Sequence, residues 1–182
     1  WDADALVAAV PGSPRQDEAA KIYRSTDEGR NWQVVAEGFR VTQWIPVRIE
    51  NRLFWLVEDG VIYSDDAGKT WHHAGGKLED VYFGPYFGKT ADDIIVGTLE
   101  GIYRSNDGGK SWERIADNIA VQLVEERARQ RAEREGEKLP EGEKPKYRFD
   151  WFIGQADFGW DPVHEKLYLT YKGFYELNLE KE

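Results

Sequence analysis

The chain has 182 residues, a length that suits one domain with a sizeable core, and we expect residues 1–182 to form a single domain. Its formal charge of −10 argues against general nucleic-acid binding, and the lack of cysteine excludes disulfides, thiolate metal sites and a cysteine nucleophile. No apolar stretch is long enough to span a bilayer, so no membrane-spanning segment is predicted. The chain begins at Trp1 and contains no methionine, which leads us to expect a processed or trimmed product.

Short extended segments separated by turn residues recur along the chain in four groups. From the N-terminus, the predicted strands are residues 5–10, 21–25 and 32–37; residues 41–49, 53–58, 61–64 and 71–74; residues 81–87, 93–99, 101–105 and 112–116; and residues 147–154, 166–171 and 173–179. The second and third groups are complete four-strand units. By comparison with them, the first group lacks its first strand and the fourth group lacks its last.

Residues 118–146 interrupt this pattern and are predicted to be a helical and loop insertion between the third and fourth groups. Asn118 suits a helix N-cap, and the residues from Ile119 to Glu135 include good helix formers without glycine or proline. Gly136 is expected to end the helix, and a charged loop should follow it.

Three arginines lie close to one face of the predicted helix: Arg127, Arg131 and Arg134. The helix is either a solvated arm, whose glutamates and arginines pair with one another, or a docking element for a partner. In the second case the arginines would bind carboxylates or lipid phosphates on the partner.

One short pattern occurs three times, with its serines 39 and 41 residues apart, and a period in this range is typical of repeat architectures. Each copy lies between two predicted strands. The positions that the copies share are Ser25, Asp27, Gly29 and Trp32; Ser64, Asp66, Gly68 and Trp71; and Ser105, Asp107, Gly109 and Trp112.

Turn chemistry accounts for every shared position. The glycine allows the positive φ that a tight hairpin needs, and the aspartate two residues earlier can accept backbone N–H groups of the same turn. The serine can add a weaker bond of this kind, and the tryptophan can cover the hairpin with a large apolar ring. A role for Asp27, Asp66 or Asp107 as a catalytic acid or calcium ligand is therefore much less favoured than a structural one.

The three copies resemble the Asp-box, or bacterial neuraminidase repeat (BNR), with the pattern Ser-x-Asp-x-Gly-x-Thr-Trp. The second copy fits at every fixed position, the third has Ser111 in place of threonine, and the first has Asn31 there. The resemblance covers residues 17–117 directly. It implies an all-β fold, a β-propeller or partial propeller of about four blades with one inserted charged helix, in which the boxes join the third and fourth strands of blades at the periphery.

Two arrangements of the incomplete end groups remain open. Either the N- and C-terminal strands together complete one blade and close a four-bladed ring, or the chain forms an open arc that covers its edges with a partner. An open arc would expose unpaired strand edges, which proteins normally avoid.

Aromatic and acidic residues on first strands, and just beyond them, form a candidate glycan-binding set: Trp44, Tyr82, Tyr86, Asp150, Trp151, Asp157 and Trp160, with Asp161 next to it. Two positioned carboxylates among them would allow glycoside hydrolysis. The competing interpretation is ordinary packing, with Asp161 at the start of a turn, and it is the favoured one. Sialidase activity is not predicted, because Ile45 to Arg48 matches the arginine motif of that group only superficially.

No catalytic residue, metal site or cofactor is predicted. His72 and His73 are adjacent and should point to opposite faces of a strand, which makes a poor metal site. The leading hypothesis is a non-catalytic scaffold that binds another protein, as an accessory or assembly subunit of a larger, membrane-associated complex. Similarity to photosystem assembly factors and receptor ectodomains of the Asp-box group suggests this role and implies an extracellular or periplasmic location. The alternative is a carbohydrate-binding module or a fragment of a glycoside hydrolase.

Overall fold

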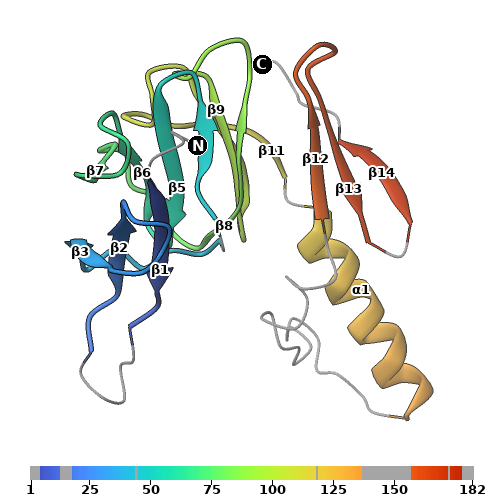
Figure 1. Ribbon diagram of the computed structural model, residues 1–182. Helices are drawn as coiled ribbons and strands as arrows, with labels where there is room; N and C mark the ends of the chain where they lie inside the picture. The colour runs from blue at the N-terminus through green and yellow to red at the C-terminus, as the bar shows by residue number, and fades with distance from the viewer. Residues whose placement is uncertain are drawn as a thin grey trace.

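The computed structural model describes residues 5–12, 18–43, 45–117, 119–136, 157–171 and 173–177, which form four antiparallel sheets and one helix (Figure 1). The first sheet consists of β1 (Leu6–Val10), β2 (Lys21–Ser25) and β3 (Gln33–Glu37); the second of β4 (Val47–Ile49), β5 (Arg52–Val57), β6 (Gly60–Ser64) and β7 (His72–His73); the third of β8 (Val81–Phe87), β9 (Ile94–Thr98), β10 (Gly101–Ser105) and β11 (Glu113–Asp117); and the fourth of β12 (Asp157–Asp161), β13 (Lys166–Thr170) and β14 (Phe174–Leu177). This arrangement confirms the predicted all-β partial propeller of about four blades with one inserted helix.

Within every sheet, strands that are neighbours in the chain are also neighbours in space. The shared motif connects β2 to β3, β6 to β7 and β10 to β11. In the two complete sheets, the connected strands are the third and the fourth. In the described residues, the first sheet therefore contains the second, third and fourth strands of a blade. The fourth sheet contains the first three.

The sheets pack face to face in chain order, with one hydrophobic cluster at each of three junctions. Ile22 of the first sheet packs with Trp55 and Val57 of the second. Phe54 and other residues of the second sheet pack with the third sheet, and the third sheet packs with the fourth in the same way. In Figure 1 the first sheet (blue) and the fourth sheet (red) lie at opposite ends of this row.

The hydrophobic pattern of each strand reflects how many faces of its sheet are covered. β9 is buried at every residue because both faces of the third sheet are covered, and its first three residues, Ile94 to Val96, are accordingly a continuous apolar run rather than an alternating one. In β13 the buried Leu167 and Leu169 alternate with more exposed residues, since only one face of the fourth sheet is packed.

The structure corrects the predicted strands at two places. Only Val47–Ile49 of the predicted strand 41–49 is a strand, and Val41 makes an isolated bridge to Val57. The predicted strand 147–154 lies outside the described residues, whereas Asp157–Asp161 forms a strand that was not predicted. Its aspartates and glycine are poor strand formers, but they alternate with Phe158 and Trp160, which pack against the core of the third and fourth sheets.

The insertion contains α1 (Ile119–Arg134), close to the predicted bounds. Gly136 has a φ of 75° and donates its N–H to the carbonyl of Glu133, so the helix ends where glycine was expected to end it. Ala132 is buried, and Leu123 packs against the cluster of the third and fourth sheets. Among the described residues, no helix has the length and apolar character needed to cross a membrane.

Candidate functional site

The box turns are closed by bonds among their own residues. In the second box, the Ser64 hydroxyl donates to Asp66 Oδ1 (2.8 Å) and accepts the N–H of Gly68 (2.8 Å). Asp66 Oδ1 also accepts the N–H groups of Lys69 (3.0 Å) and Thr70 (2.9 Å), and Oδ2 accepts the Thr70 hydroxyl (2.7 Å). Both oxygens of the carboxylate are thus engaged within a segment of seven residues.

The other two boxes repeat these bonds with different side chains. Ser111 donates its hydroxyl to Asp107 Oδ2 at 2.6 Å. In the first box, Asn31 donates its side-chain amide to Asp27 Oδ2 at 2.6 Å, so an amide replaces the missing hydroxyl. The boxes therefore tolerate three different donors at this position.

Positive φ angles occur at the three shared glycines, which have values of 84°, 78° and 88° at Gly29, Gly68 and Gly109. The preceding residue in each box is also left-handed, and in the first two boxes it is not glycine. Glycine adopts such angles at the least steric cost, and a Cβ at Gly68 or Gly109 would lie only 2.8 or 2.9 Å from a side chain of the preceding sheet, which together favour glycine at this position.

The bonds hold the box carboxylates in their charged form. Burial raises the pKa of Asp66, but hydrogen bonds from Thr70 and Ser64 outweigh burial and lower that pKa to about 2. Bonds from Asn31 and Ser111 likewise lower the pKa of Asp27 and Asp107, respectively. A general acid must carry a proton at working pH, so these carboxylates are unsuited to that role.

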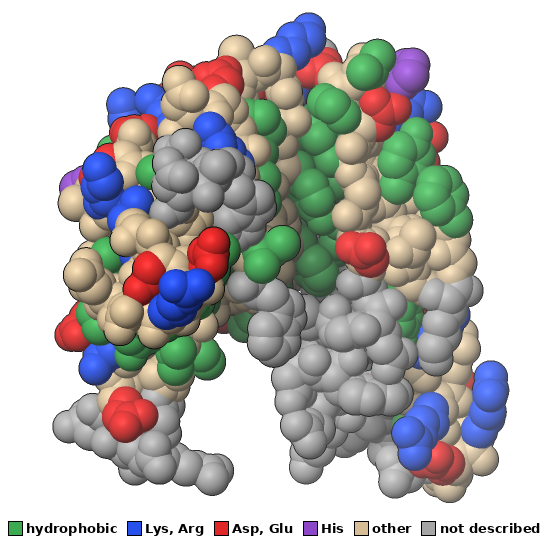
Figure 2. Space-filling view, viewed as in Figure 1, with side chains coloured by type: hydrophobic (Ala, Val, Ile, Leu, Met, Phe, Trp, Pro, Cys, Tyr) green, Lys and Arg blue, Asp and Glu red, His purple; other side chains and the backbone are tan. Residues whose placement is uncertain are grey.

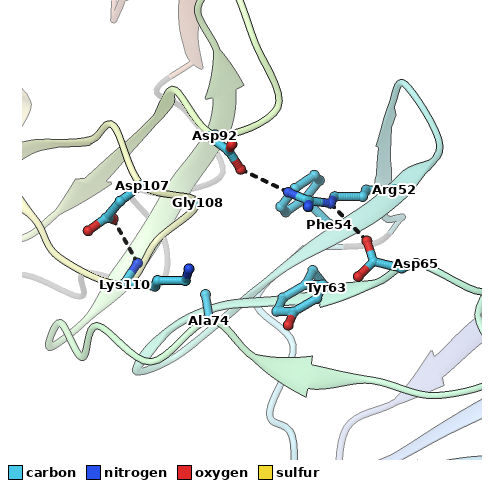
Figure 3. A pocket seen from close by; sticks show the side chains of 9 residues that line it. All are labelled: Arg52, Phe54, Tyr63, Asp65, Ala74, Asp92, Asp107, Gly108 and Lys110. Atoms are coloured by element: carbon cyan, nitrogen blue, oxygen red, sulfur yellow. Dashed lines mark hydrogen bonds and ion pairs between the residues drawn. The ribbon is translucent and has the colours of Figure 1, made fainter.

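A hollow of about 260 Å³ lies at the rim between the second sheet and the third box (Figure 3). Arg52 lies between two carboxylates there, with 2.8 Å from its Nε to Asp65 and 2.8 Å from another of its nitrogens to Asp92. Tyr63 and Lys110 also line the hollow. Because Arg52 is already paired with two carboxylates, the hollow has no uncommitted guanidinium for an anionic ligand.

Arginines also bridge the other sheet junctions, and none of these arginines was predicted from the sequence to do so. Arg24 of the first sheet donates its Nε–H to the carbonyl of Ala67 in the second box (2.9 Å). Arg104 of the third sheet makes two bonds of 2.8 Å to Asp93 and one of 3.0 Å to Glu165, in the turn after β12. The sequence did contain a signal for Arg24 and Arg104, since each directly precedes the serine of a box.

The structure describes four members of the predicted glycan-binding set. Tyr86 donates its hydroxyl to the carbonyl of Phe158 (2.7 Å), and Trp160 donates its Nε1–H to the carbonyl of Phe87 (3.0 Å). These bonds join the third sheet to the fourth, so the polar atoms of both aromatic residues are committed to the fold. Tyr82 donates its hydroxyl to Asp80 (3.3 Å).

Trp44, Asp150 and Trp151 lie outside the described residues. Asp157 is exposed. Burial raises the pKa of Tyr86, and the negative charge of Asp157 raises it further. The Tyr86 phenol therefore stays protonated near neutral pH and is a poor nucleophile.

The two described carboxylates of this region do not form a hydrolytic pair. Asp157 and Asp161 are four residues apart on β12, which corresponds to about 13 Å along a strand. Glycosidases hold their carboxylates about 5–9.5 Å apart. Asp161 also accepts the N–H groups of Val163 and His164, and its other oxygen lies 2.6 Å from the His164 ring, so it shapes the turn after β12.

The three helix arginines have different surroundings. The Arg127 guanidinium lies 5.1 Å from the centre of the Tyr171 ring, so it packs within the molecule. Arg131 pairs with Glu135 at 2.8 Å, and its side chain is 79% exposed. Arg134 is exposed, and Figure 2 shows charged side chains gathered at the lower end of α1. Within the described residues, no group of histidine and acidic side chains could hold a metal ion.

The first sheet exposes the face that its neighbours bury. Leu6 is paired with the serine of the first box, as Leu53 and Ile94 are paired with the serines of the second and third boxes. Counting from these pairs, Val10 corresponds to Val57 and Thr98. Val10 is 53% exposed, whereas Val57 and Thr98 are 1% and 2% exposed. Val57 packs in one cluster with Ile22 of the preceding sheet.

This surface extends across the sheet. We call it the open face of the first sheet, and its exposed members are Leu6, Val10, Trp32 and Val34, which are 41–53% exposed. Exposed apolar residues gathered on one sheet face indicate an interaction surface. The strands of the first three sheets have the same register relative to their boxes, so the corresponding positions could be identified from the sequence. The register alone does not show which sheet lacks a neighbour.

Comparison with known proteins supports the repeat. The BNR/Asp-box repeat family matches residues 62–73 and 103–114, which contain the tryptophans of the second and third boxes. No curated protein matches the sequence. One similar solved structure is an ancestral GH74 enzyme, with a TM-score of 0.43 and 16% identity, over 96% of this chain and 22% of the enzyme chain. The chain thus spans less than a quarter of that enzyme, and it carries BNR/Asp-box repeats.

Proposed function

We propose that this chain is a non-catalytic scaffold that binds another protein through the open face of its first sheet. The observation that carries the proposal is the exposure of Val10, when the corresponding residues of the second and third sheets are buried. A sheet face with this composition gains most by burial against another apolar sheet or helix. The first box contributes Trp32, and exposed tryptophans often anchor protein interfaces.

The chemistry of the described residues favours binding over catalysis. The box carboxylates are ionised and bonded within their own turns. Tyr86 and Trp160 use their polar atoms to join two sheets. A scaffold role needs only a stable shape and an apolar contact surface, and the chain offers both. We extend the proposal to a role as an accessory or assembly subunit of a larger complex, outside the cytoplasm, as the Asp-box resemblance suggests.

The exposed end of α1 is part of the proposal as a second contact. Arg131 and Arg134 can form charge-assisted bonds with an acidic or phosphate-bearing partner surface. We assign no such role to Arg127, because it packs over Tyr171. Charge reversal of Arg131 and Arg134 to glutamate should weaken association and leave thermal stability nearly unchanged, since both side chains are exposed.

The test compares two glutamate substitutions of exposed valines. Tagged wild-type chain, Val10→Glu and Val163→Glu are used to recover bound proteins from extracts of cells that make the protein. Val163 is the matched control, because it is 81% exposed and lies in the turn after β12, away from the open face of the first sheet. We expect Val10→Glu alone to lose the bound protein.

Equal recovery with all three chains would reject the open face as a binding site. A glycan array and a hydrolysis screen on the wild-type chain test the alternative function. Binding of a glycan that is abolished by a substitution at Tyr82 or Trp160, in a chain that remains folded, would favour a carbohydrate-binding module instead.

A further inference from the structure

The fourth sheet also exposes a face that the other sheets bury. Phe174 directly follows a glycine at the start of the third strand, as Val61 follows Gly60 in the second sheet and Ile102 follows Gly101 in the third. Val61 and Ile102 are 0% and 1% exposed, whereas Phe174 is 68% exposed. Tyr168 stacks on Phe174 with ring centres 5.1 Å apart, and these two residues define the open face of the fourth sheet. Figure 2 shows apolar side chains on the surface of this sheet, at the right of the view.

The two open faces are opposite halves of one repeated contact. At the junction of the second and third sheets, Val61 packs in one cluster with Ile94 and Val96. Val61 corresponds to Phe174 of the fourth sheet, and Ile94 corresponds to Leu6 of the first. The open face of the fourth sheet therefore corresponds to the face that packs against the following sheet elsewhere in the row. The open face of the first sheet corresponds to the face that packs against the preceding sheet.

The box turns support the same polarity. The side-chain position of Gly68 in the second box lies 2.8 Å from Val7 of the first sheet, and that of Gly109 in the third box lies 2.9 Å from Ala74 of the second. Each of these turns thus rests on the preceding sheet. At Gly29 of the first box, the nearest atoms belong to Leu6 and Trp32 of its own sheet. The first box has the shape of a contact to a preceding sheet.

We propose that two copies of this chain associate head to tail, with the open face of the fourth sheet of each copy packed on the open face of the first sheet of the other. The inference rests on the proposed function and names the protein that the open face binds. The two faces of one copy lie at opposite ends of its row and do not meet (Figure 1). Two rows of four sheets would give a ring of about eight blades, within the size range of propellers.

Both open faces carry charged side chains beside their apolar residues. The open face of the first sheet carries the ion pair Lys21–Glu37 (3.9 Å), next to Val10 in the register. The fourth sheet carries the pair Lys166–Glu176 (2.8 Å), which adjoins Tyr168. In the register Asp157 pairs with Thr170 and Asp161 with Lys166, so both aspartates lie on this same face, which carries more anions than cations. A contact between unlike surfaces that closes after two copies gives a discrete dimer rather than a filament.

The experiment measures the mass of the purified chain by light scattering across a concentration series. We expect a dimer for the wild-type chain and for the control Ile45→Glu, because Ile45 is 64% exposed and lies just before the second sheet, which already has a neighbour on each side. Val10→Glu and Phe174→Glu should each raise the dimer dissociation constant by about tenfold or more, because each places a charge in an apolar contact. In every dimer of a single variant, both contacts contain one altered face.

Mixing the two variants is the decisive step. A mixture of Val10→Glu and Phe174→Glu chains retains one contact in which both faces are unaltered, so the mixture should form more dimer than either variant alone. A dimer of Phe174→Glu as stable as the wild type would show that Phe174 lies outside the contact, and it would overturn the head-to-tail arrangement. Circular dichroism of each variant checks that it is folded.

The outcomes separate this inference from the proposed function. A wild-type chain that stays monomeric at all concentrations overturns the association of two copies. If Val10→Glu nevertheless loses a different protein in the recovery experiment, the scaffold function stands and only the identity of the partner was wrong. If Val10→Glu changes neither mass nor recovery, both proposals fail.

Discussion

Trp112 of the third box donates its indole N–H to the carbonyl of Gly76 at 3.0 Å, and Gly76 donates its N–H to the carbonyl of Gly109 at 2.9 Å. Two residues of one box thus bind a single glycine beyond the last strand of the preceding sheet. A side chain at position 76 would meet the Trp112 ring at 2.7 Å, so only glycine fits there. The box therefore closes a turn and also binds the preceding sheet.

The three box tryptophans should differ in their contribution to stability, in the order of their burial. Trp71 is 6% exposed, so Trp71→Ala should lower the free energy of unfolding by about 3–5 kcal/mol. Trp112→Ala should cost less because its ring is only half-buried, and Trp32→Ala least, because its ring is 41% exposed in the single chain. Urea unfolding monitored by circular dichroism measures the three values. A cost for Trp32→Ala equal to that for Trp71→Ala would contradict this order.

Asp66→Ala should lower the free energy of unfolding by about 1–3 kcal/mol, because it leaves turn N–H groups without their acceptor. Glu79→Ala is a matched control, since Glu79 is an exposed acidic residue outside the boxes. Urea unfolding of both variants at neutral pH tests the prediction. If Asp66→Ala left stability unchanged but abolished binding, the structural assignment of the box carboxylate would be wrong.

Acid should destabilise the wild-type chain partly through Asp66. The pKa of this carboxyl is lowered from 3.8 to about 2 in the folded state. Its contribution to stability is therefore fully present above pH 3.8 and is lost as the pH falls through about 2. The difference in melting temperature between wild type and Asp66→Asn should be largest near neutral pH and should shrink between pH 4 and pH 2. A constant difference over this range would show that ionisation of Asp66 does not stabilise the fold.

Arg104→Ala should loosen the junction between the third and fourth sheets. The Arg104 and Asp93 side chains are only 19% and 14% exposed, so the substitution leaves a mostly buried carboxylate without its two-bond partner. We expect a loss of about 1–3 kcal/mol in the free energy of unfolding. Arg114→Ala is the control, because Arg114 forms an exposed pair with Asp117, and it should cost no more than about 1 kcal/mol. Equal costs for both variants would argue against a special role for Arg104.

The box turns were predictable from the sequence because their bonds are local. Asp66 finds its donors within four residues, and Gly68 adopts its positive φ within the same turn. Such contacts depend on neighbouring residues, so three copies sufficed to predict the hairpins, and their resemblance to the Asp-box implied the blade type. The end of α1 at Gly136 is another local feature, and it was predicted for the same reason.

Features that join distant parts of the chain were not predictable. Arg104 and Glu165 are 61 residues apart, and nothing near Arg104 indicates which acidic residue it binds. In the same way, packing was favoured over sugar binding for Tyr86 and Trp160, but the carbonyls that they bind across the third and fourth sheets became apparent only in the folded chain. The strand Asp157–Asp161 was missed because Phe158 and Trp160 are stabilised by packing on another sheet rather than by local propensity.

The sequence by itself determined the repeated blade, the turn chemistry and the place of the inserted helix, since each depends on residues a few positions apart. Only the tertiary structure decided that the four sheets form a row with two open faces. Val10 and Val57 occupy corresponding positions in similar strands, and only the presence of a preceding sheet makes one exposed and the other buried. Burial depends on what lies across the sheet, and that neighbour is placed by the packing of the whole chain.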